Sequence, residues 1–201
     1  MSKRGLSELP PFDEESGDLN VIVETPKRSR NKFDYDEERG LFKLGGVLPA
    51  GAFFPFDFGF VPSTVGGDGD PVDVLLLMDE PAFPGCLVAA RLVAVIEAEQ
   101  TERDGERTRN DRLIAVAAGS RTHRDVRTLA DLSDALLSEI EHFFVSYNEI
   151  KGKKFEPRGR FGPKRARELV EEAAKKRGGK RRARKGAGKA LGGGKARKGG
   201  R

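Results

Sequence analysis

The densest group of residues that could do chemistry is a short acidic segment, Asp-Gly-Asp-Pro-Val-Asp, which begins at Asp68. The carboxylates of Asp68, Asp70 and Asp73 would repel one another unless a cation or water lay between them. Gly69 lets the backbone turn and Pro71 stiffens it just before an apolar stretch. Such a loop can direct three oxygens at one point, as a magnesium or manganese site requires. The alternative is a solvated turn, because Asp, Gly and Pro are common turn residues.

Other metal-binding side chains are scarce in this sequence. It contains one cysteine, Cys86, and two histidines, His123 and His142, among 201 residues. This composition excludes a disulfide framework and a thiolate zinc site, and leaves little for a histidine site. Any bound metal must therefore use carboxylates, which favours a hard cation such as Mg²⁺. We expect His142 to be structural and Cys86 to be a small buried hydrophobe.

Charge is divided unevenly along the chain. Lysine and arginine number 37 against 32 acidic residues, a net charge of +5, but 13 of the cations and none of the acids lie in residues 175–201. The rest of the chain keeps 24 basic and 32 acidic residues and carries a net charge of −8. This division excludes an evenly basic nucleic-acid-binding domain. The tail has too much charge and glycine to form a core, so we predict that residues 175–201 are disordered. Two roles stay open for it: a solvated extension, or attachment to nucleic acid or another polyanion.

The sequence gives no sign of membrane association. No apolar run approaches the roughly 20 residues of a membrane span. Residues 1–18 are polar and acidic, unlike a secretory signal, and we interpret them as a loose leader. We therefore expect a cytoplasmic protein without a membrane partner.

Short strand candidates precede two helix candidates. The strand candidates cover residues 21–24, 32–36, 41–44, 72–78, 87–96 and 112–117. Glycine and proline separate these strands, as is typical of a small barrel or sandwich. An apolar stripe at helical spacing from Leu132 to Tyr147 predicts one helix, and Pro163 is expected to begin a second. Strands followed by helices indicate one α+β domain, which we place at residues 19–174.

Further motifs surround the aspartate segment in a fixed order. They are Val-Ile-Val-Glu-Thr-Pro-Lys from Val21, Phe-Gly-Phe-Val-Pro from Phe58 and His-Phe-Phe from His142. Together they resemble the soluble family I inorganic pyrophosphatases over roughly Leu19 to Lys154. The resemblance implies a small, closed, five-stranded β-barrel of OB-like form with flanking helices. It also implies a homo-oligomer that hydrolyses pyrophosphate with Mg²⁺, or with Mn²⁺ in its place.

The same resemblance implies roles for the acidic residues. Asp70 matches the residue that accepts a proton from the attacking water, and it is also a candidate metal ligand. Asp68 and Asp73 match metal ligands, and Glu24 matches an acidic residue that serves an outer metal ion. Asp34 stands at a family glutamate and is one methylene shorter.

The phosphate-binding positions are partly kept. Lys32 and Tyr147 match positions that bind phosphate in the family. Arg112 stands where the family has a lysine, a change that keeps the charge but not its geometry. Gly46 lies where the family has a phosphate-binding arginine, and Asn148 lies where a lysine follows the tyrosine.

Other departures affect hydroxyl groups and metal ligands. Phe54 and Phe58 replace two active-site tyrosines, and Asn110 replaces a metal-binding aspartate. Asp111 can substitute for it only if the preceding charged stretch, residues 97–109, forms a loop that shifts the register. Three arginines are candidates for replacing the lost cations: Arg28, Arg30 and Arg91. The sequence thus leaves three hypotheses open. The first is a pyrophosphatase of reduced efficiency, and the second is a protein of the same fold that binds metal and phosphate without efficient turnover. The third is a polyanion-attached protein whose main role is carried by the tail.

Overall fold

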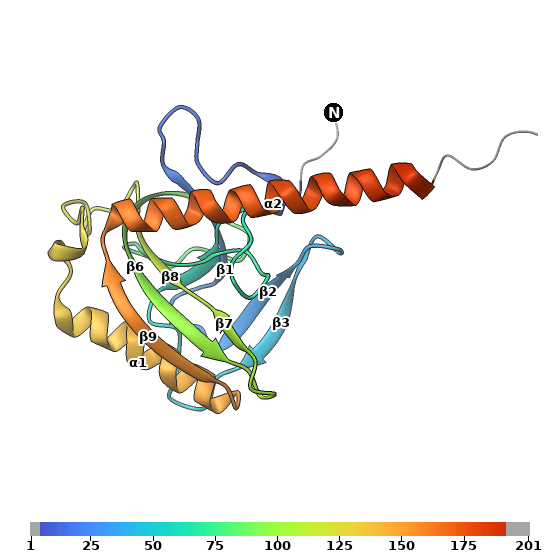
Figure 1. The fold of residues 1–201 in the computed structure, drawn as a ribbon. Coiled ribbons are helices and arrows are strands. Elements are labelled where there is room, and N and C mark those ends of the chain that lie inside the picture. Colours follow the sequence, from blue (N-terminus) through green and yellow to red (C-terminus); the bar gives the residue numbers. More distant parts are fainter. Residues whose placement is uncertain (1–4, 192–201) are drawn as a thin grey trace, which may run out of the picture.

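Five strands close into a ring in the computed structural model, which describes residues 5–191 and places side chains as far as Gly179. In ring order the strands are β1 (Leu19–Thr25), β4 (Asp57–Phe60), β5 (Asp73–Leu77), β8 (Arg112–Ala117) and β6 (Leu87–Thr101), which pairs back with β1. Only the β5–β8 pair is parallel within this ring. The predicted five-stranded closed arrangement is confirmed (Figure 1).

The other strands extend or flank this ring. β7 (Arg107–Arg109) and β9 (Lys154–Phe161) both pair with β6, while β2 (Asn31–Asp36) and β3 (Leu41–Val47) form a separate hairpin. The charged stretch expected to be a loop is largely strand, because β6 continues to Thr101 and its Glu99 pairs with Arg109 of β7. The expectation of a long loop there is therefore wrong.

Two α-helices lie on different sides of the ring (Figure 1). Helix α1 (Asp134–Ile150) begins at an N-cap, Ser133, whose hydroxyl accepts the N–H of Leu136. Helix α2 begins at Pro163 as predicted and runs to Leu191, so helix is present from residue 175 to 191 where we predicted disorder. That prediction for residues 192–201 lies outside the described residues. Two short 3₁₀ turns, η1 (Leu6–Glu8) and η2 (Leu129–Asp131), complete the elements. None of the helices described is both long enough and apolar enough to cross a membrane.

The core has two halves that share the strands of the ring. Along β5, Val74 and Leu76 belong to the cluster under α2, whereas Leu75 and Leu77 belong to the cluster against α1. This alternation follows from the two-residue period of a strand. Buried on both faces, β5 holds its first residue, Asp73, at a fixed position on the rim of the ring.

Candidate active site

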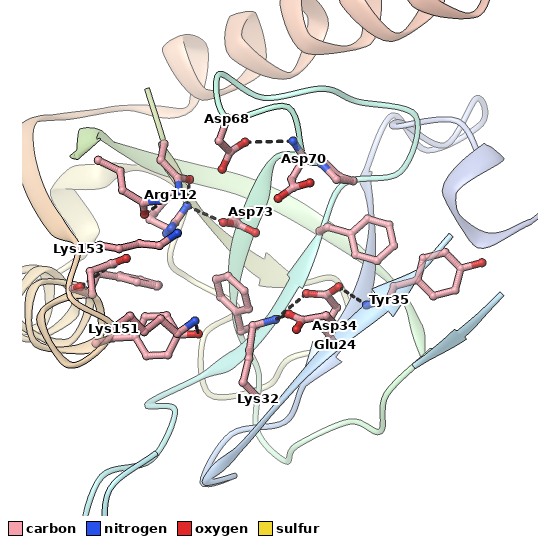
Figure 2. Close-up of a pocket in the computed structure, with 18 of the residues that line it drawn as sticks. Glu24, Lys32, Asp34, Tyr35, Asp68, Asp70, Asp73, Arg112, Lys151 and Lys153 are labelled. Atoms are coloured by element: carbon pink, nitrogen blue, oxygen red, sulfur yellow. Dashed lines mark hydrogen bonds and ion pairs between the residues drawn. The ribbon is translucent and has the colours of Figure 1, made fainter. Parts of the chain in front are cut away.

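A pocket of about 470 Å³ opens between the β2–β3 hairpin, the loop before β5 and the end of α1 (Figure 2). Its charged lining residues are Glu24, Lys32, Asp34, Glu37, Lys43, Asp68, Asp70, Asp73, Arg112, Lys151 and Lys153. Tyr35, Gln100, Asn110, Tyr147 and Asn148 add polar groups. The fold thus brings together the residues matched above to catalytic, metal-binding and phosphate-binding positions, but not Asp111 or the three arginines considered as replacement cations.

The aspartate loop is held in shape by its own hydrogen bonds. Asp68 accepts the N–H of Asp70 at 3.2 Å, and the N–H of Gly66 donates to the carbonyl of Asp70 at 2.6 Å. Gly69 has a φ of 97°, a conformation that glycine adopts without strain. The loop ends where the N–H of Val72 donates to the hydroxyl of Thr64, and β5 then begins at Asp73.

Two carboxylates of this loop, those of Asp68 and Asp73, have raised pKa values. The pKa of Asp68 is raised to about 6 by partial removal of its carboxyl from water and by the nearby charges of Asp73 and Asp70. Burial also raises the pKa of Asp73, and the guanidinium of Arg112 opposes this shift. A bound cation would relieve the mutual repulsion of these groups.

The carboxylates of the aspartate loop can supply some of the ligands that Mg²⁺ needs, but not all of them. Among the described residues, no three acidic, histidine or cysteine side chains are gathered closely enough to form a complete site. Mg²⁺ commonly uses one or two carboxylates, with water and substrate phosphates as its remaining ligands. The oxygens of Asp68, Asp70 and Asp73 at an open pocket fit that requirement.

Glu24 is buried and fastens the β2–β3 hairpin to the ring. Its Oε2 accepts a hydrogen bond from Lys32 Nζ at 2.9 Å, and its Oε1 accepts one from the N–H of Tyr35 at 2.8 Å. Lys32 Nζ also donates to Asp34 Oδ1 at 2.8 Å. Burial alone would lower the pKa of Lys32, but the carboxylates of Glu24 and Asp34 outweigh it and raise that pKa. Lys32 therefore stays a cation inside the pocket.

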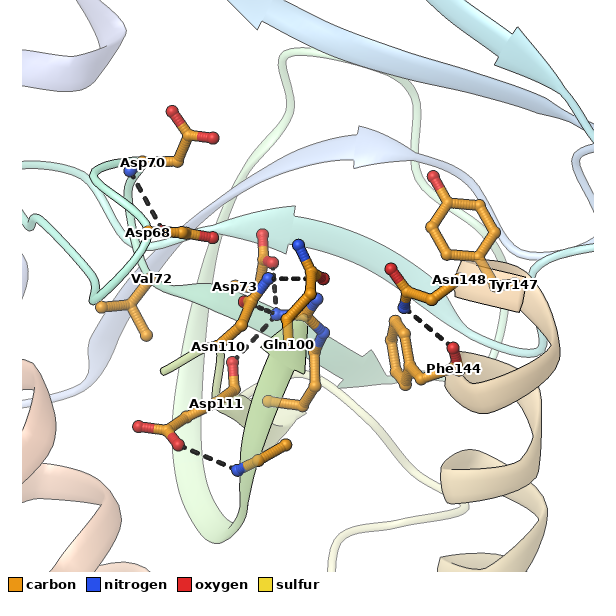
Figure 3. A network of polar contacts seen from close by, with 12 residues as sticks. Asp68, Asp70, Val72, Asp73, Gln100, Asn110, Asp111, Phe144, Tyr147 and Asn148 are labelled. Carbon is orange, nitrogen blue, oxygen red and sulfur yellow. Dashed lines mark hydrogen bonds and ion pairs between the residues drawn. The ribbon is translucent and has the colours of Figure 1, made fainter. Parts of the chain in front are cut away.

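Arg112 lies at the other end of the pocket and joins a network of amides, of which Gln100 and Asn110 are labelled in Figure 3. Its Nη1 lies 2.6 Å from Asp73 Oδ2 and also donates to Oδ1 of Asn110. Asn110 in turn donates to Gln100 Oε1 at 3.1 Å. The guanidinium lies over the ring of Phe144, 4.8 Å from its centroid, and its Nε has no hydrogen-bond partner in the described part of the chain.

Asp111 points away from this pocket (Figure 3). Its Oδ1 accepts the N–H of Ala98 at 3.1 Å, and its Oδ2 lies 2.6 Å from Nε of Arg109. Asn110 takes the pocket side, because neighbours in an extended chain face opposite ways. Asp111 therefore does not line this pocket, although it lines a separate small cavity of about 20 Å³ together with Asp68 and Asp73.

The positions where this sequence differs from the family pattern have different surroundings in the structure. A Cβ on Gly45 would lie 1.7 Å from Asp34 Oδ2, whereas a Cβ on Gly46 would meet nothing within 4 Å. Asn148 lines the pocket, but its amide nitrogen donates to the carbonyl of Phe144 at 2.8 Å. Phe54 is fully buried in the core against α1.

The expected replacement cations are not at the pocket. Arg28, Arg30 and Arg91 do not line it; Arg30 donates to the carbonyl of Leu48 and Arg91 to that of Val126. The cations that the sequence analysis missed are three lysines: Lys43, Lys151 and Lys153. The signal for Lys151 was present, because it follows Tyr147 by four residues, about one helical turn.

Comparison with known proteins identifies the family. The family model described as inorganic pyrophosphatase matches residues 21–177. The chain belongs to the inorganic pyrophosphatase family. Its similarity to the inorganic pyrophosphatase of Halalkalibacterium halodurans is 36% identity over 77% of this chain and 91% of the relative.

Solved structures of inorganic pyrophosphatases share this fold. The crystal structure of the Thermus thermophilus inorganic pyrophosphatase matches with a TM-score of 0.78 and 33% identity, covering 87% of this chain and 99% of that one. The Neisseria gonorrhoeae inorganic pyrophosphatase matches with a TM-score of 0.76 and 28% identity, covering 85% and 96%. Membership of the family therefore rests on sequence and on structure together.

Proposed function

We propose that this chain hydrolyses inorganic pyrophosphate to two phosphates with carboxylate-bound Mg²⁺. The observation that carries the proposal is one pocket in which the carboxylates of Asp68, Asp70 and Asp73 face a group of lysine and arginine side chains. Pyrophosphate needs both, since metal ions neutralise part of its charge and protein cations orient the rest. Mn²⁺ also prefers oxygen ligands and can take the same place.

The metal would be held by the aspartate loop. Asp68, Asp70 and Asp73 are its proposed ligands, and Glu24 is the candidate ligand for an outer ion. When bound, Mg²⁺ neutralises charge on pyrophosphate and makes a water molecule more acidic. The raised pKa of Asp68 supports this assignment, because crowded carboxylates favour a cation between them.

The side chains of the pocket supply the proton transfer and the orientation. Asp70 accepts the proton of the attacking water, whose oxygen bonds to one phosphorus while the bridging P–O bond breaks. Lys32, Arg112 and Tyr147 bind phosphate oxygens and hold the substrate in line for attack. Asp70 is exposed on the aspartate loop, where water reaches it freely.

We infer that turnover is reduced relative to a site that keeps the arginine and lysine missing at Gly46 and Asn148. A hydrogen bond to a charged group contributes about 1.5–3 kcal/mol. Each ~1.4 kcal/mol lost only in the transition state lowers the rate about tenfold. The alternative is a protein that binds metal and phosphate without efficient turnover, and the amide of Asn148, already bonded to Phe144, is the observation that favours it.

The test is phosphate release from magnesium pyrophosphate by the full chain. We expect measurable release from the wild type and none from Asp70→Asn, because an amide cannot accept the proton. Asp125→Asn is the matched control, since the side chain of Asp125 is 90% exposed and lies outside the pocket. If folded wild-type protein releases no phosphate, the alternative of a binding protein is favoured. If Asp70→Asn releases phosphate as fast as the wild type, Asp70 is not the general base.

We also propose two kinds of partner. A homo-oligomer is supported by large apolar side chains exposed on the hairpin and nearby loops, namely Leu41, Leu44, Val47, Phe53 and Phe83. Attachment to nucleic acid or another polyanion is supported by the 13 cations of residues 175–201. A cytoplasmic location stays a prediction.

A further inference from the structure

Lys151 lies just past the end of α1 and turns its side chain back into the pocket (Figure 2). Its Nζ donates to the hydroxyl of Tyr147 and lies 4.1 Å from the centroid of that ring. Figure 2 shows it with Arg112 and Lys153 on one side of the pocket, while Asp34 and Asp70 lie on the other. The pocket thus has a cationic corner, where Asp73 is paired with Arg112, and two further carboxylates on the opposite side.

Lys151 differs from the other cations of the pocket in having no carboxylate partner. Four of the five cations that line the pocket have a carboxylate oxygen within 4.0 Å. These pairs are Lys32 with Glu24 at 2.9 Å, Lys43 with Asp36 at 3.7 Å, Arg112 with Asp73 at 2.6 Å and Lys153 with Glu102 at 2.7 Å. Among the described residues Lys151 has no such pair, so no carboxylate is in direct contact with its ammonium.

The surroundings of Lys151 disfavour the charged form of its ammonium group. Partial burial lowers the pKa of Lys151. Among the charged neighbours Asp34 has the largest effect and raises this pKa, while Lys32, Lys153 and Arg112 lower it. The carboxylate of Asp34 is already paired with Lys32 at 2.8 Å. An anion bound beside Lys151 would remove this penalty.

The residues beyond Lys151 favour an anion over a metal ion at this corner. The side chains of Gln100 and Asn110 that reach the pocket here are neutral amides, bonded to each other. Glu102 is paired with Lys153, and the buried Nε of Arg112 is a donor without a partner in the described chain. A divalent cation would find little negative charge in this corner, whereas a tetrahedral oxyanion would find several donors.

We propose that Lys151 is the principal ligand of an anion subsite that binds a phosphate group directly, without a bridging divalent cation. The choice of phosphate rests on the function proposed above, and the direct mode of binding rests on the corner itself. Asn148 stands where the family has a lysine and carries no charge. In this arrangement Lys151, about one helical turn further along at the end of α1, supplies the cation instead. Arg112 and Lys153 complete the positive field around the bound group.

The test is calorimetric titration of the full chain with inorganic phosphate in the presence of EDTA and at fixed ionic strength. We expect saturable binding by the wild type and at least about tenfold weaker binding by Lys151→Met, the change expected from one charged hydrogen bond. Lys154→Met is the matched control, because Lys154 lies outside the pocket, is 66% exposed and pairs with Glu156. It should bind phosphate as the wild type does, and it retains the same basic tail.

Two further measurements are needed. The first distinguishes the effect of the Lys151 charge from that of its packing, and the second distinguishes phosphate binding at this subsite from hydrolysis of pyrophosphate. Lys151→Arg should restore most of the phosphate affinity, since it restores the charge. Absence of saturable binding without metal, or equal affinity in Lys151→Met and wild type, would overturn the subsite even if the wild type hydrolyses magnesium pyrophosphate. Phosphate binding that depends on Lys151 in a chain without hydrolysis would uphold the subsite and overturn the proposed function.

Discussion

Gly46 lies directly opposite Lys32 in the β2–β3 hairpin, and a Cβ built on it would have nothing within 4 Å. Residues opposite one another in an antiparallel pair present their side chains on the same face of the sheet. Lys32 points its ammonium into the pocket, so a longer side chain at position 46 would reach the same space. The cation missing from this strand can therefore be restored without displacing other groups.

We predict that Gly46→Arg raises the rate of pyrophosphate hydrolysis by about tenfold, because one charged contact to the transition state is worth about that factor. Phosphate release at saturating Mg²⁺ measures the effect. Gly119→Arg is the control, since Gly119 is exposed, has equal space for a Cβ and lies outside the pocket. An equal or lower rate in Gly46→Arg would mean that position 46 does not reach the substrate.

The neighbouring glycine should behave in the opposite way. In Gly45→Ala the new methyl group would overlap the carboxylate of Asp34, which must leave its position beside Lys32. We expect hydrolysis to fall by up to about fivefold, the worth of a half-exposed ion pair, with little change in melting temperature. Gly46→Ala is the matched control and should leave the rate unchanged. A large loss of stability in Gly45→Ala would show that the backbone, not Asp34, gives way.

The raised pKa of Asp68 predicts a pH dependence of the metal-free protein. Between about pH 4 and pH 6 its carboxyl holds a proton in the folded state and not in the unfolded state. The free energy of unfolding in EDTA should therefore decrease as the pH rises through this window. Thermal melts should show a shallower decrease in Asp68→Asn, because that variant has no group to titrate there.

Above the pKa of Asp68, Mg²⁺ should oppose the decrease in the free energy of unfolding that we expect in EDTA. Mg²⁺ binds the ionised carboxylate, so it should raise the melting temperature more at about pH 7 than at about pH 5. Asp104→Asn, which changes an exposed aspartate in the turn after β6, should respond as the wild type does. If Asp68→Asn keeps the full response to Mg²⁺, Asp68 is not a metal ligand.

We expect that the end of the basic tail, residues 180–201, can be removed without unfolding the rest of the chain. Among the side chains described, which end at residue 179, Ala173 is the last buried apolar residue of α2, and Arg177 pairs with Glu37 on the hairpin side. Removal of residues 180–201 should therefore leave the melting temperature and phosphate release unchanged. Retention on nucleic acid, if the tail confers it, should fall with salt and disappear in the truncated chain. Retention that survives truncation would place the binding surface on the body.

Local sequence patterns predicted the elements with strong periodicity. The stripe from Leu132 to Tyr147 located α1 and included the buried Ile140, although two other buried residues, Leu137 and Phe144, lie beside that stripe. β9 was not predicted, because it contains Pro157 and four charged residues. It forms by pairing along the outer part of β6, a long-range contact that no local pattern reveals.

The candidate site was predictable to the extent that its residues lie in motifs. The aspartate loop and Lys32 fall in such motifs, and the structure places them in one pocket. Lys151 was missed because its importance depends on how the chain leaves α1 and folds back over Tyr147. The orientation of Asp111 likewise depends on the pairing of β7 with β6, which the sequence alone suggested would be a loop.

The attachment of the β2–β3 hairpin bears on how this site can change over evolutionary time. Within the described part of the chain β3 pairs with β2 alone, and the hairpin is tied to the ring through Glu24 and Thr25 of β1. Substitutions on β3 can therefore alter the charge around the substrate without altering a single ladder of the ring. Of the two adjacent glycines on β3, Gly46 is a position where a charge can be lost or regained during evolution, whereas Gly45 is constrained by its contact with Asp34.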